Sequence, residues 1–211
     1  MASTNEHSIS YRLMNLEDID KIVSLENTIW SYGLRAEKKL IRQRLIWQHA
    51  MLGAFKANRL IGMACWRYGQ FTPTDINSMP INFNQFANQA NQVVFNAAFV
   101  YNFALLPEIR NSKIGPQLIA NGINILLENH CDYLVGASRC PSYTLTNVSS
   151  LRLAINDYPA RAIPWEIDPT LSFYKKALNC EFTRPLVNFL PEDKESGGYA
   201  IGFYKKINQA L

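Results

Sequence analysis

The residues best suited to chemistry lie where an apolar stretch meets a predicted helix. Residues 105–116 have the sequence LLPEIRNSKIGP: a predicted strand ends, a turn with Arg110 and Lys113 follows, and a helix begins at Gly115. Backbone N–H groups at a helix N-terminus point outward together, and the helix dipole favours negative charge there. The two cationic side chains add to this field. The segment therefore predicts an anion-binding site, and a pyrophosphate is its natural guest.

This segment resembles the acetyl-CoA-binding motif of the GNAT acyltransferase superfamily, V-x-P-x-x-(Q/R)-x-x-G-x-(G/A). Pro107, Arg110 and Gly115 match its proline, its Gln/Arg position and its last glycine. Lys113 replaces the first glycine, and its Cβ restricts the backbone beside the phosphates. Pro116 suits a first helical turn but removes one N–H group. The resemblance implies that the pyrophosphate of acetyl-CoA, or of another acyl-CoA, contacts six residues: Arg110, Asn111, Ser112, Lys113, Ile114 and Gly115.

A second match lies nearer the carboxyl end. Residues 171–182, LSFYKKALNCEF, resemble the FYxxxGF ending of the same superfamily, with Asn179 to Phe182 in place of the glycine turn. In that family the tyrosine often protonates the departing CoA thiolate, and this role falls on Tyr174. A tyrosine has an ordinary pKa of about 10, so it is protonated at neutral pH and can donate. The alternative is a tyrosine that only packs against the sheet.

Three further segments resemble a GNAT subgroup: residues 136–143, 168–173 and 188–200. The subgroup includes the acetyltransferase part of fusions to nitrilase-like amidohydrolases and the GNAT-like loading domains of polyketide synthases. Those loading domains decarboxylate malonyl-CoA and load the acyl group onto a carrier-protein thiol. They commonly have histidine where this chain has Tyr174, and the three histidines here lie elsewhere. This departure favours plain acyl transfer over decarboxylation and leaves transfer to a thiol open.

The predicted central strand, residues 93–106, lacks the carboxylate that many GNAT enzymes use to deprotonate an amine. It contains no Asp or Glu, and its strongest hydrogen-bonding side chains are Asn96, Tyr101 and Asn102. A water chain or a residue elsewhere could serve, or the acceptor could be a thiol, whose free pKa is near 8.5. The expected acceptor pocket comprises Trp30, Tyr32, Tyr101, Arg139 and Cys140. A cysteine such as Cys140 is more often a small buried hydrophobic residue than a nucleophile.

The hydrophobic pattern predicts the elements that hold these residues, in the order βααββ, loop, βαβ, αββ. The expected strands are residues 9–13, 52–56, 60–68, 93–106, 133–137, 182–188 and 199–205. The expected helices are residues 16–29, 35–49, 115–129 and 168–178, with short ones at 84–91, inside a long Asn- and Gln-rich loop, and at 149–156. Asn15 and Asp18 form a partial capping-box pattern at the first helix.

This order resembles the GNAT fold, an α/β fold in one domain spanning residues 1–211. The fold has a mixed, mostly antiparallel sheet of about seven strands, about four helices, and splayed fourth and fifth strands. The resemblance implies that the splayed strands hold the pantetheine. It also implies that a backbone N–H among Phe103, Ala104 and Leu105 polarises the thioester carbonyl.

Composition excludes several classes of protein. Hydrophobic residues make up 48% and charged residues 18%, which suits a globular core rather than a disordered chain. The net charge of +4 comes without a run of five Lys/Arg, so no nucleic-acid tail is predicted. The four cysteines form no CxxC pair, so we expect reduced thiols and no metal. Neither a signal peptide nor a membrane-spanning stretch is visible, which favours a cytoplasmic protein.

Taken together, these patterns favour an acyl-CoA-dependent acyltransferase, foremost an acetyl-CoA N-acetyltransferase with direct attack in a ternary complex. Its acceptor would be a small-molecule amine or a protein. One alternative is S-acyl transfer, or malonyl-CoA decarboxylation and loading, toward a carrier-protein thiol. Another is a catalytically weak CoA-binding regulatory module, suggested by Lys113 and by the absent carboxylate. Either a monomer or a homodimer fits the sequence.

Overall fold

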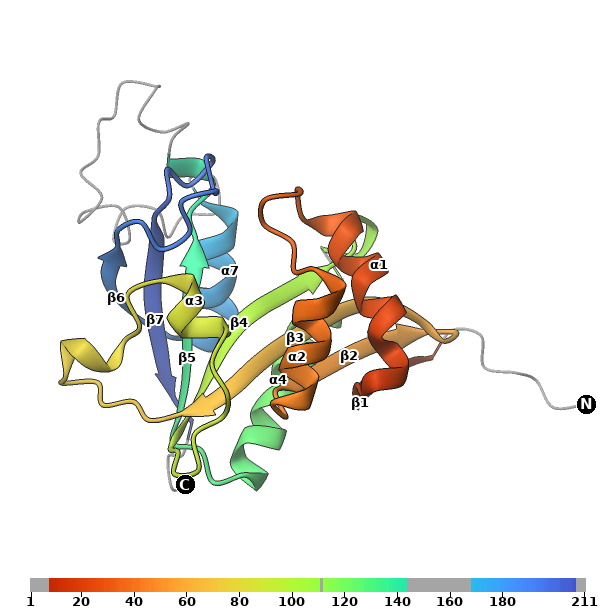
Figure 1. Ribbon diagram of the computed structural model, residues 1–211, viewed down its shortest axis with the longest axis horizontal. Coiled ribbons are helices and arrows are strands. Elements are labelled where there is room, and N and C mark those ends of the chain that lie inside the picture. Colours follow the sequence, from red (N-terminus) through yellow and green to blue (C-terminus); the bar gives the residue numbers. More distant parts are fainter. Residues whose placement is uncertain (1–7, 111, 144–167, 208–211) are drawn as a thin grey trace, which may run out of the picture.

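The computed structural model describes residues 8–110, 112–143 and 168–207, and these form one seven-stranded sheet (Figure 1). The strands run in the order β1-β2-β3-β4-β5-β7-β6. Only the β4–β5 pair is parallel, and every other pair is antiparallel. The strands are β1 Ile9–Leu13, β2 Ala50–Lys56, β3 Arg59–Gly69, β4 Ala97–Leu105, β5 Tyr133–Arg139, β6 Glu181–Leu186 and β7 Ala200–Lys206. All seven predicted strands are therefore present.

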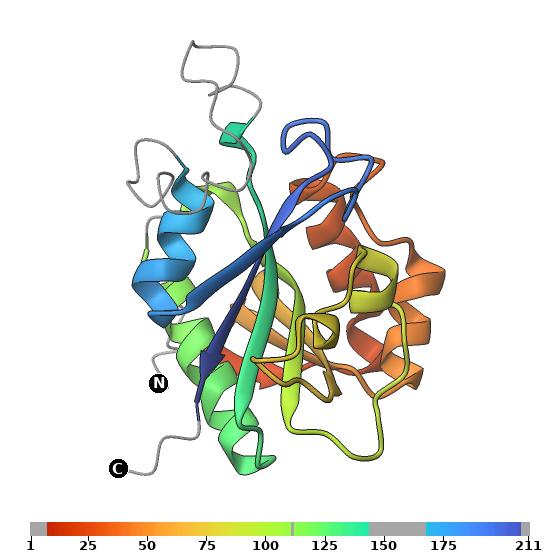
Figure 2. The same ribbon diagram turned by 90° about the vertical axis from the view of Figure 1, so that its left-hand side faces the viewer.

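Helices cover both faces of the sheet (Figure 2). The first three pack on one face and the last two on the other. The α-helices are α1 Ile19–Ile29, α2 Lys38–Ile46, α3 Phe83–Ala87, α4 Ile114–Glu128 and α7 Pro169–Leu178. Short 3-10 turns are η1 Leu16–Asp18, η2 Ile76–Ser78 and η3 Pro107–Ile109. The four long helices were predicted, and the helix predicted at 149–156 lies outside the described residues.

Local sequence explains the start of the first helical segment. Asn15 accepts a hydrogen bond from the N–H of Glu17 at 2.9 Å, and the Asp18 carboxylate accepts one from the N–H of Asn15 at 3.2 Å. The predicted capping box is therefore present. The guanidinium of Arg12 on β1 donates two hydrogen bonds of 2.7 Å to the same carboxylate, so the cap also connects the helix to the sheet.

The central strand is shorter than its apolar sequence predicts. Val93 and Val94 are 97% and 69% exposed, and β4 begins only at Ala97. The preceding segment turns back onto the end of β3, where the N–H of Asn96 donates to the carbonyl of Gly69 at 3.1 Å. The prediction of a strand from residue 93 was wrong because an apolar residue type does not by itself bury a side chain, and these two valines lie on an exposed loop.

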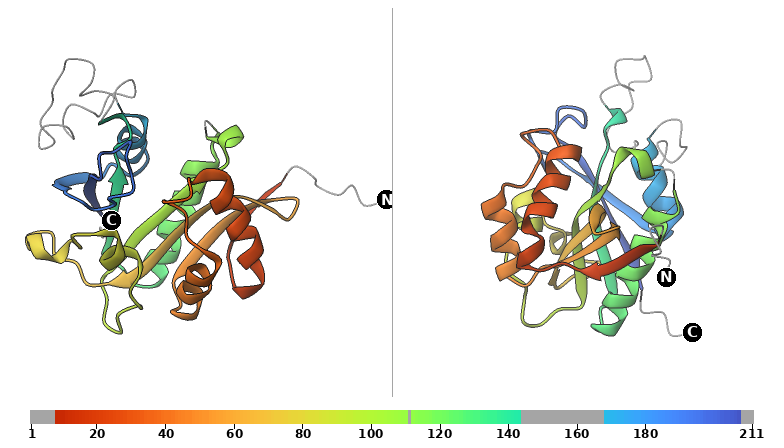
Figure 3. Two further views of the ribbon diagram at one scale, coloured as in Figure 1. Left: turned by 45° about the horizontal axis from the view of Figure 1, so that its top comes forward. Right: turned by 90° about the vertical axis from the view of Figure 1, so that its right-hand side faces the viewer.

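The sheet splits between its two parallel strands. β4 and β5 pair only from Ala97 with Tyr133 to Val100 with Gly136, and beyond these pairs the strands diverge (Figure 3). The divergence begins at a bulge, since Trp66 and Cys65 of β3 pair with Val100 and Asn102, which leaves Tyr101 as the extra residue. The predicted splay is confirmed, and it leaves one edge of the second half of β4 without a strand partner.

The described residues were also compared with the requirements of a membrane-spanning helix and of a metal site. No helix in the described ranges is long and apolar enough to cross a membrane. Within the same ranges, no group of three or more His, Cys, Asp and Glu side chains is arranged to hold a metal ion.

Candidate active site

The predicted anion cradle lies where the open half of β4 ends. η3 follows β4, and α4 begins directly after Lys113, whose backbone has φ −73° and ψ −3°. These are ordinary helical angles, so the Cβ that replaces the motif's first glycine costs no backbone strain. The N–H groups of Lys113 and Gly115 belong to the helical turn that has no intrahelical acceptors. Arg110 and Lys113 are exposed, and no carboxylate within the described residues forms an ion pair with either. Asn111 lies outside the described residues.

Gly115 lies in a tightly packed place. A Cβ at this position would lie 3.0 Å from Leu105 of β4 and 3.5 Å from the ring of Phe173 on α7. The missing side chain therefore lets the start of α4 approach β4 closely. This approach brings the cradle next to the unpaired strand edge formed by Phe103, Ala104 and Leu105.

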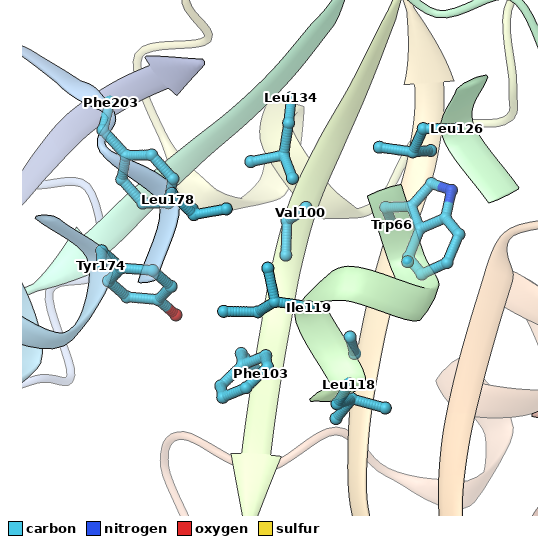
Figure 4. Close-up of a pocket in the computed structure, with 12 residues that line it drawn as sticks. Trp66, Val100, Phe103, Leu118, Ile119, Leu126, Leu134, Tyr174, Leu178 and Phe203 are labelled. Atoms are coloured by element: carbon cyan, nitrogen blue, oxygen red, sulfur yellow. The ribbon is translucent and has the colours of Figure 1, made fainter. Parts of the chain in front are cut away.

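Tyr174 lies across the split from that edge. Its ring packs against Phe203 of β7 at 4.7 Å and against Phe103 of β4 at 6.3 Å between ring centroids. Figure 4 shows its hydroxyl directed into an apolar cavity of about 30 Å³, toward Phe103 and Ile119. No hydrogen bond within the described part of the chain engages the hydroxyl. Burial raises the pKa of Tyr174 above 10, so the hydroxyl keeps its proton at neutral pH.

The residues expected to form the acceptor pocket do not form one pocket. The guanidinium of Arg139 lies 5.5 Å from the ring of Trp30, so these two do come together. Arg139 also pairs with Asp193 at 2.5 Å and with Glu195 at 2.9 Å, which neutralises its charge. Tyr32 is 80% exposed on the loop after α1.

Cys140 and Tyr101 are both buried, in separate surroundings. Cys140 packs with Leu171 and Ile201, and burial raises the pKa of its thiol to about 12. The thiol is therefore protonated and a poor nucleophile at neutral pH. Tyr101 instead points toward α2, where Arg44 covers its ring at 4.5 Å.

Comparisons with known proteins identify this architecture. No protein-family model and no curated protein matches the sequence. The loading GNATL domain of CurA from Lyngbya majuscula matches with a TM-score of 0.81 at 15% identity, over 95% of this chain and 98% of that one. The GphF GNAT-like decarboxylase, solved with isobutyryl-CoA, matches with a TM-score of 0.81 at 18% identity, over 94% and 100%.

The chain has a GNAT fold. A third solved structure, the ribosomal-protein-S18-alanine N-acetyltransferase from Escherichia coli, matches with a TM-score of 0.59 at 13% identity over 97% of both chains. The GNAT architecture thus extends over the whole matched length in each case. Function has to be argued from the site itself, since one fold serves many functions.

Within the GNAT fold, a buried carboxylate that the sequence analysis missed lies at the split. Glu26 of α1 is 2% exposed; it accepts hydrogen bonds from the N–H of Ala36 at 2.9 Å and from the side-chain amide of Asn102 on β4. Burial raises the pKa of Glu26, against the opposing effect of these donors. The available signal was a glutamate at position 26 beside Ile22 and Leu25, in the apolar stripe of the predicted helix.

His49 is a second buried polar residue on this side of the GNAT sheet. Its Nε2 lies 2.7 Å from the carbonyl of Gln89, which can only accept, so Nε2 carries the proton. Its Nδ1 then accepts from the hydroxyl of Tyr101 at 3.2 Å. Burial lowers the pKa of His49 to about 4, so the ring is neutral at pH 7. The pair fixes Tyr101 at the bulge where the split begins.

Proposed function

We propose that this protein is an acyl-CoA-dependent acyltransferase that transfers the acyl group directly from the CoA thioester to an acceptor. One observation carries the proposal: the unpaired edge of β4, the cradle at the start of α4 and the hydroxyl of Tyr174 all adjoin one split. An extended thioester with a pyrophosphate at one end needs these three features in this order. The solved GNAT-like decarboxylase with isobutyryl-CoA supports the assignment of the ligand class.

The residues of this chain divide the binding between them. Backbone groups of Phe103, Ala104 and Leu105 pair with the pantetheine as a strand would, and one N–H donates to the thioester carbonyl. The backbone N–H groups of Lys113 and Gly115 hold the pyrophosphate, with the cations Arg110 and Lys113 beside it. The N–H groups of Ser112 and Ile114 already donate within the turn, to the carbonyl of Ile109 and to the hydroxyl of Ser112. The ordinary backbone of Lys113 supports this fit, because the lost glycine was the main objection to it.

The chemistry requires one proton donor and one proton acceptor. The acceptor's nucleophilic atom bonds to the carbonyl carbon, the carbon–sulfur bond breaks, and the leaving sulfur takes the proton of Tyr174. An amine nucleophile also gives up a proton. The carboxylate of Glu26 contacts Asn102 of β4, and we propose that it receives this proton through water or positions Asn102 for the acceptor. The proton that the acceptor released then replaces the one that Tyr174 gave to the sulfur, which restores the enzyme.

Two classes of acceptor follow from different observations. The carboxylate at the split favours an amine acceptor, and hence N-acetylation of a small molecule or a protein with acetyl-CoA. The higher TM-scores for a loading domain and a decarboxylase, 0.81 against 0.59 for an N-acetyltransferase, favour a carrier-protein thiol and malonyl-CoA as second candidates. Tyr174 in place of histidine supports the first.

A direct experiment separates these functions. Purified protein is titrated with acetyl-CoA and with malonyl-CoA by calorimetry, and the products are identified by mass spectrometry. Saturable binding of acetyl-CoA that stays intact until an amine is added supports N-transfer. Conversion of malonyl-CoA to acetyl-CoA supports the loading function. Absence of binding to both would refute acyl transfer, and binding without any turnover would leave a CoA-binding regulatory module.

Replacing Tyr174 tests the proton donor. Tyr174→Phe keeps the ring that packs on Phe203 and removes only the hydroxyl, so we expect kcat to fall about 10²-fold with CoA binding unchanged. Tyr133→Phe on β5 is the matched control and should retain activity. Steady-state kinetics with the best acceptor measure both. Full turnover by Tyr174→Phe would remove the tyrosine from the mechanism.

A further inference from the structure

A polar pocket lies away from the split, beneath the segment that carries η2 and α3. This segment is on the face of the sheet that also carries α1 and α2 (Figure 2). The pocket measures about 280 Å³. Arg67 of β3 lies opposite Phe99 of β4, in the half where β4 and β5 are still paired. The pocket is therefore distinct from the proposed CoA site. Its lining residues are Arg67, Gln70, Asn77, Ser78, Pro80, Gln85, Gln89, Gln92 and Phe99.

Arg67 lacks one of its hydrogen bonds. The residue is 3% exposed; its Nε donates to the carbonyl of Phe86 at 2.7 Å and its Nη2 donates to the carbonyl of Gln85 at 3.0 Å. Its guanidinium carbon lies 4.6 Å from the ring of Phe99. Nη1 is buried and has no partner. A buried donor without an acceptor costs on the order of 1–3 kcal/mol, and more when it is charged.

The charge of Arg67 is also uncompensated. Burial lowers its pKa to about 10, so the guanidinium remains positive at neutral pH. No carboxylate within the described residues forms an ion pair with it, and every other side chain that lines the pocket is neutral. A buried arginine is normally paired with an anion. An external anion in the pocket would supply the missing negative charge.

We propose that this pocket binds the carboxylate of a small organic acid, with the positive guanidinium of Arg67 as its anchor. A single guanidinium surrounded by neutral amides matches an anion of one negative charge, whereas phosphate dianions call for more cations. The volume is below the roughly 300–1,000 Å³ of sites for drug-sized ligands, which limits the ligand to a small acid. The inference is independent of acyl transfer.

Gln89 connects this pocket to the split and offers a way to block it. Its side chain is exposed at the pocket and makes no hydrogen bond within the described residues, so it can rearrange around an incoming carboxylate. Its carbonyl accepts from His49, which in turn holds Tyr101 at the bulge of β4. A ligand beside Gln89 is therefore two hydrogen bonds from the strand that forms the split.

The test measures binding of acetate, propionate and sulfate to the whole protein, with no acyl-CoA present. Calorimetry and thermal melts are run at constant ionic strength, with chloride as the reference anion. We expect saturable binding of the carboxylates and a shift of the Arg67 guanidinium ¹⁵N resonance on addition of acetate. Sulfate should not compete. The absence of a saturable response, or tighter binding of sulfate than of carboxylates, would overturn the proposal.

Three variants sharpen the result. Gln89→Glu places an internal carboxylate at the pocket, so acetate affinity should fall more than about tenfold while folding is retained. Gln43→Glu on α2 makes the same charge change outside the lining and should leave affinity within about twofold. Arg67→Gln should abolish binding; if it does not fold, Gln89→Glu decides. Equal affinity in wild type and Gln89→Glu would show that the carboxylates bind elsewhere.

Discussion

At the residue scale, Glu26 is placed at a cost in stability. Transfer of a carboxylate from water into a buried site is unfavourable, and the raised pKa of Glu26 expresses this penalty. Two donors, the N–H of Ala36 and the amide of Asn102, offset part of it. Glu26 therefore lowers stability while lying beside a proposed reaction site. A trade-off between stability and activity produces residues of this kind.

Glu26→Gln tests this trade-off. Glutamine has the same shape without the charge, so the variant should be more stable than wild type at pH 7. The pKa of Glu26 is raised in the folded state above its unfolded value of about 4.5. Below that value both states are protonated and the carboxyl does not destabilise the fold, whereas stability is lost as pH rises through the folded pKa. The gain of the variant should therefore vanish below about pH 4.5. Denaturant unfolding at pH 4 and pH 7 measures it.

The same variant should lose activity if Glu26 receives a proton from the acceptor. We expect kcat/KM at pH 7 to fall at least about tenfold and its pH profile to lose the acidic limb. Glu17→Gln, an exposed change in η1, is the control for both measurements. A fully active Glu26→Gln protein with wild-type stability would show that the carboxylate has neither role.

At this scale the sequence offers contiguous signals. Arg110, Gly115 and Tyr174 belong to short motifs, and the structure brings these motifs to one split; their roles stay predictions. Glu26 and Arg67 were missed because their importance comes from burial, which depends on segments far away in the chain. Glu26 meets Asn102 across 76 positions, and Arg67 meets the carbonyls of α3, which no local pattern encodes.

At the element scale, periodicity located the strands and long helices, and their ends were set by local hydrogen bonds. α2 begins at Lys38 rather than at residue 35 because Glu37 has extended backbone angles, φ −70° and ψ 155°. α3 covers only Phe83–Ala87, with the side chain of Asn82 capping it by accepting from the N–H of Gln85 at 2.9 Å. The segment around it has no clear period because it is built on such side-chain caps.

The cap of α7 matters because this helix carries Tyr174. Asp168 is buried, and one carboxylate oxygen accepts from the N–H of Thr170 at 2.9 Å and of Leu171 at 3.1 Å. Asp168→Ala removes both bonds and should lower the free energy of unfolding by about 1–2 kcal/mol. Urea unfolding monitored by circular dichroism gives the value.

Asp168→Asn serves as the conservative comparison, because asparagine also caps helices and should recover most of the loss. Asp20→Ala, which removes an exposed ion pair with Lys38, should change stability by less than about 1 kcal/mol. If Asp168→Ala matched Asp20→Ala, the cap would not be what holds the start of α7.

At the scale of the whole molecule, two parts of the sheet meet over a short seam. β1 to β4 form one part and β5 to β7 the other, and only four residue pairs, from Ala97 with Tyr133 to Val100 with Gly136, join them along the sheet. Gly136 is in the last pair of this seam, and the ring of Phe203 occupies the place that its side chain would take; a Cβ there would lie 2.1 Å from the ring. A ligand lying in the split would contact both parts and add to this seam.

Ligand binding should therefore stabilise the entire fold. At about 100 times its dissociation constant, CoA should add about 2.7 kcal/mol to the free energy of unfolding, which corresponds to a rise in Tm of about 5–10 °C for a chain of this size. Pantetheine, which lacks the pyrophosphate, should give a smaller rise at equal concentration. Lys113→Glu reverses one charge of the cradle and should reduce the response to CoA but not to pantetheine. Thermal melts at several ligand concentrations measure all three. Equal responses to CoA and pantetheine would mean that residues 110–115 do not hold the pyrophosphate, whatever the split itself binds.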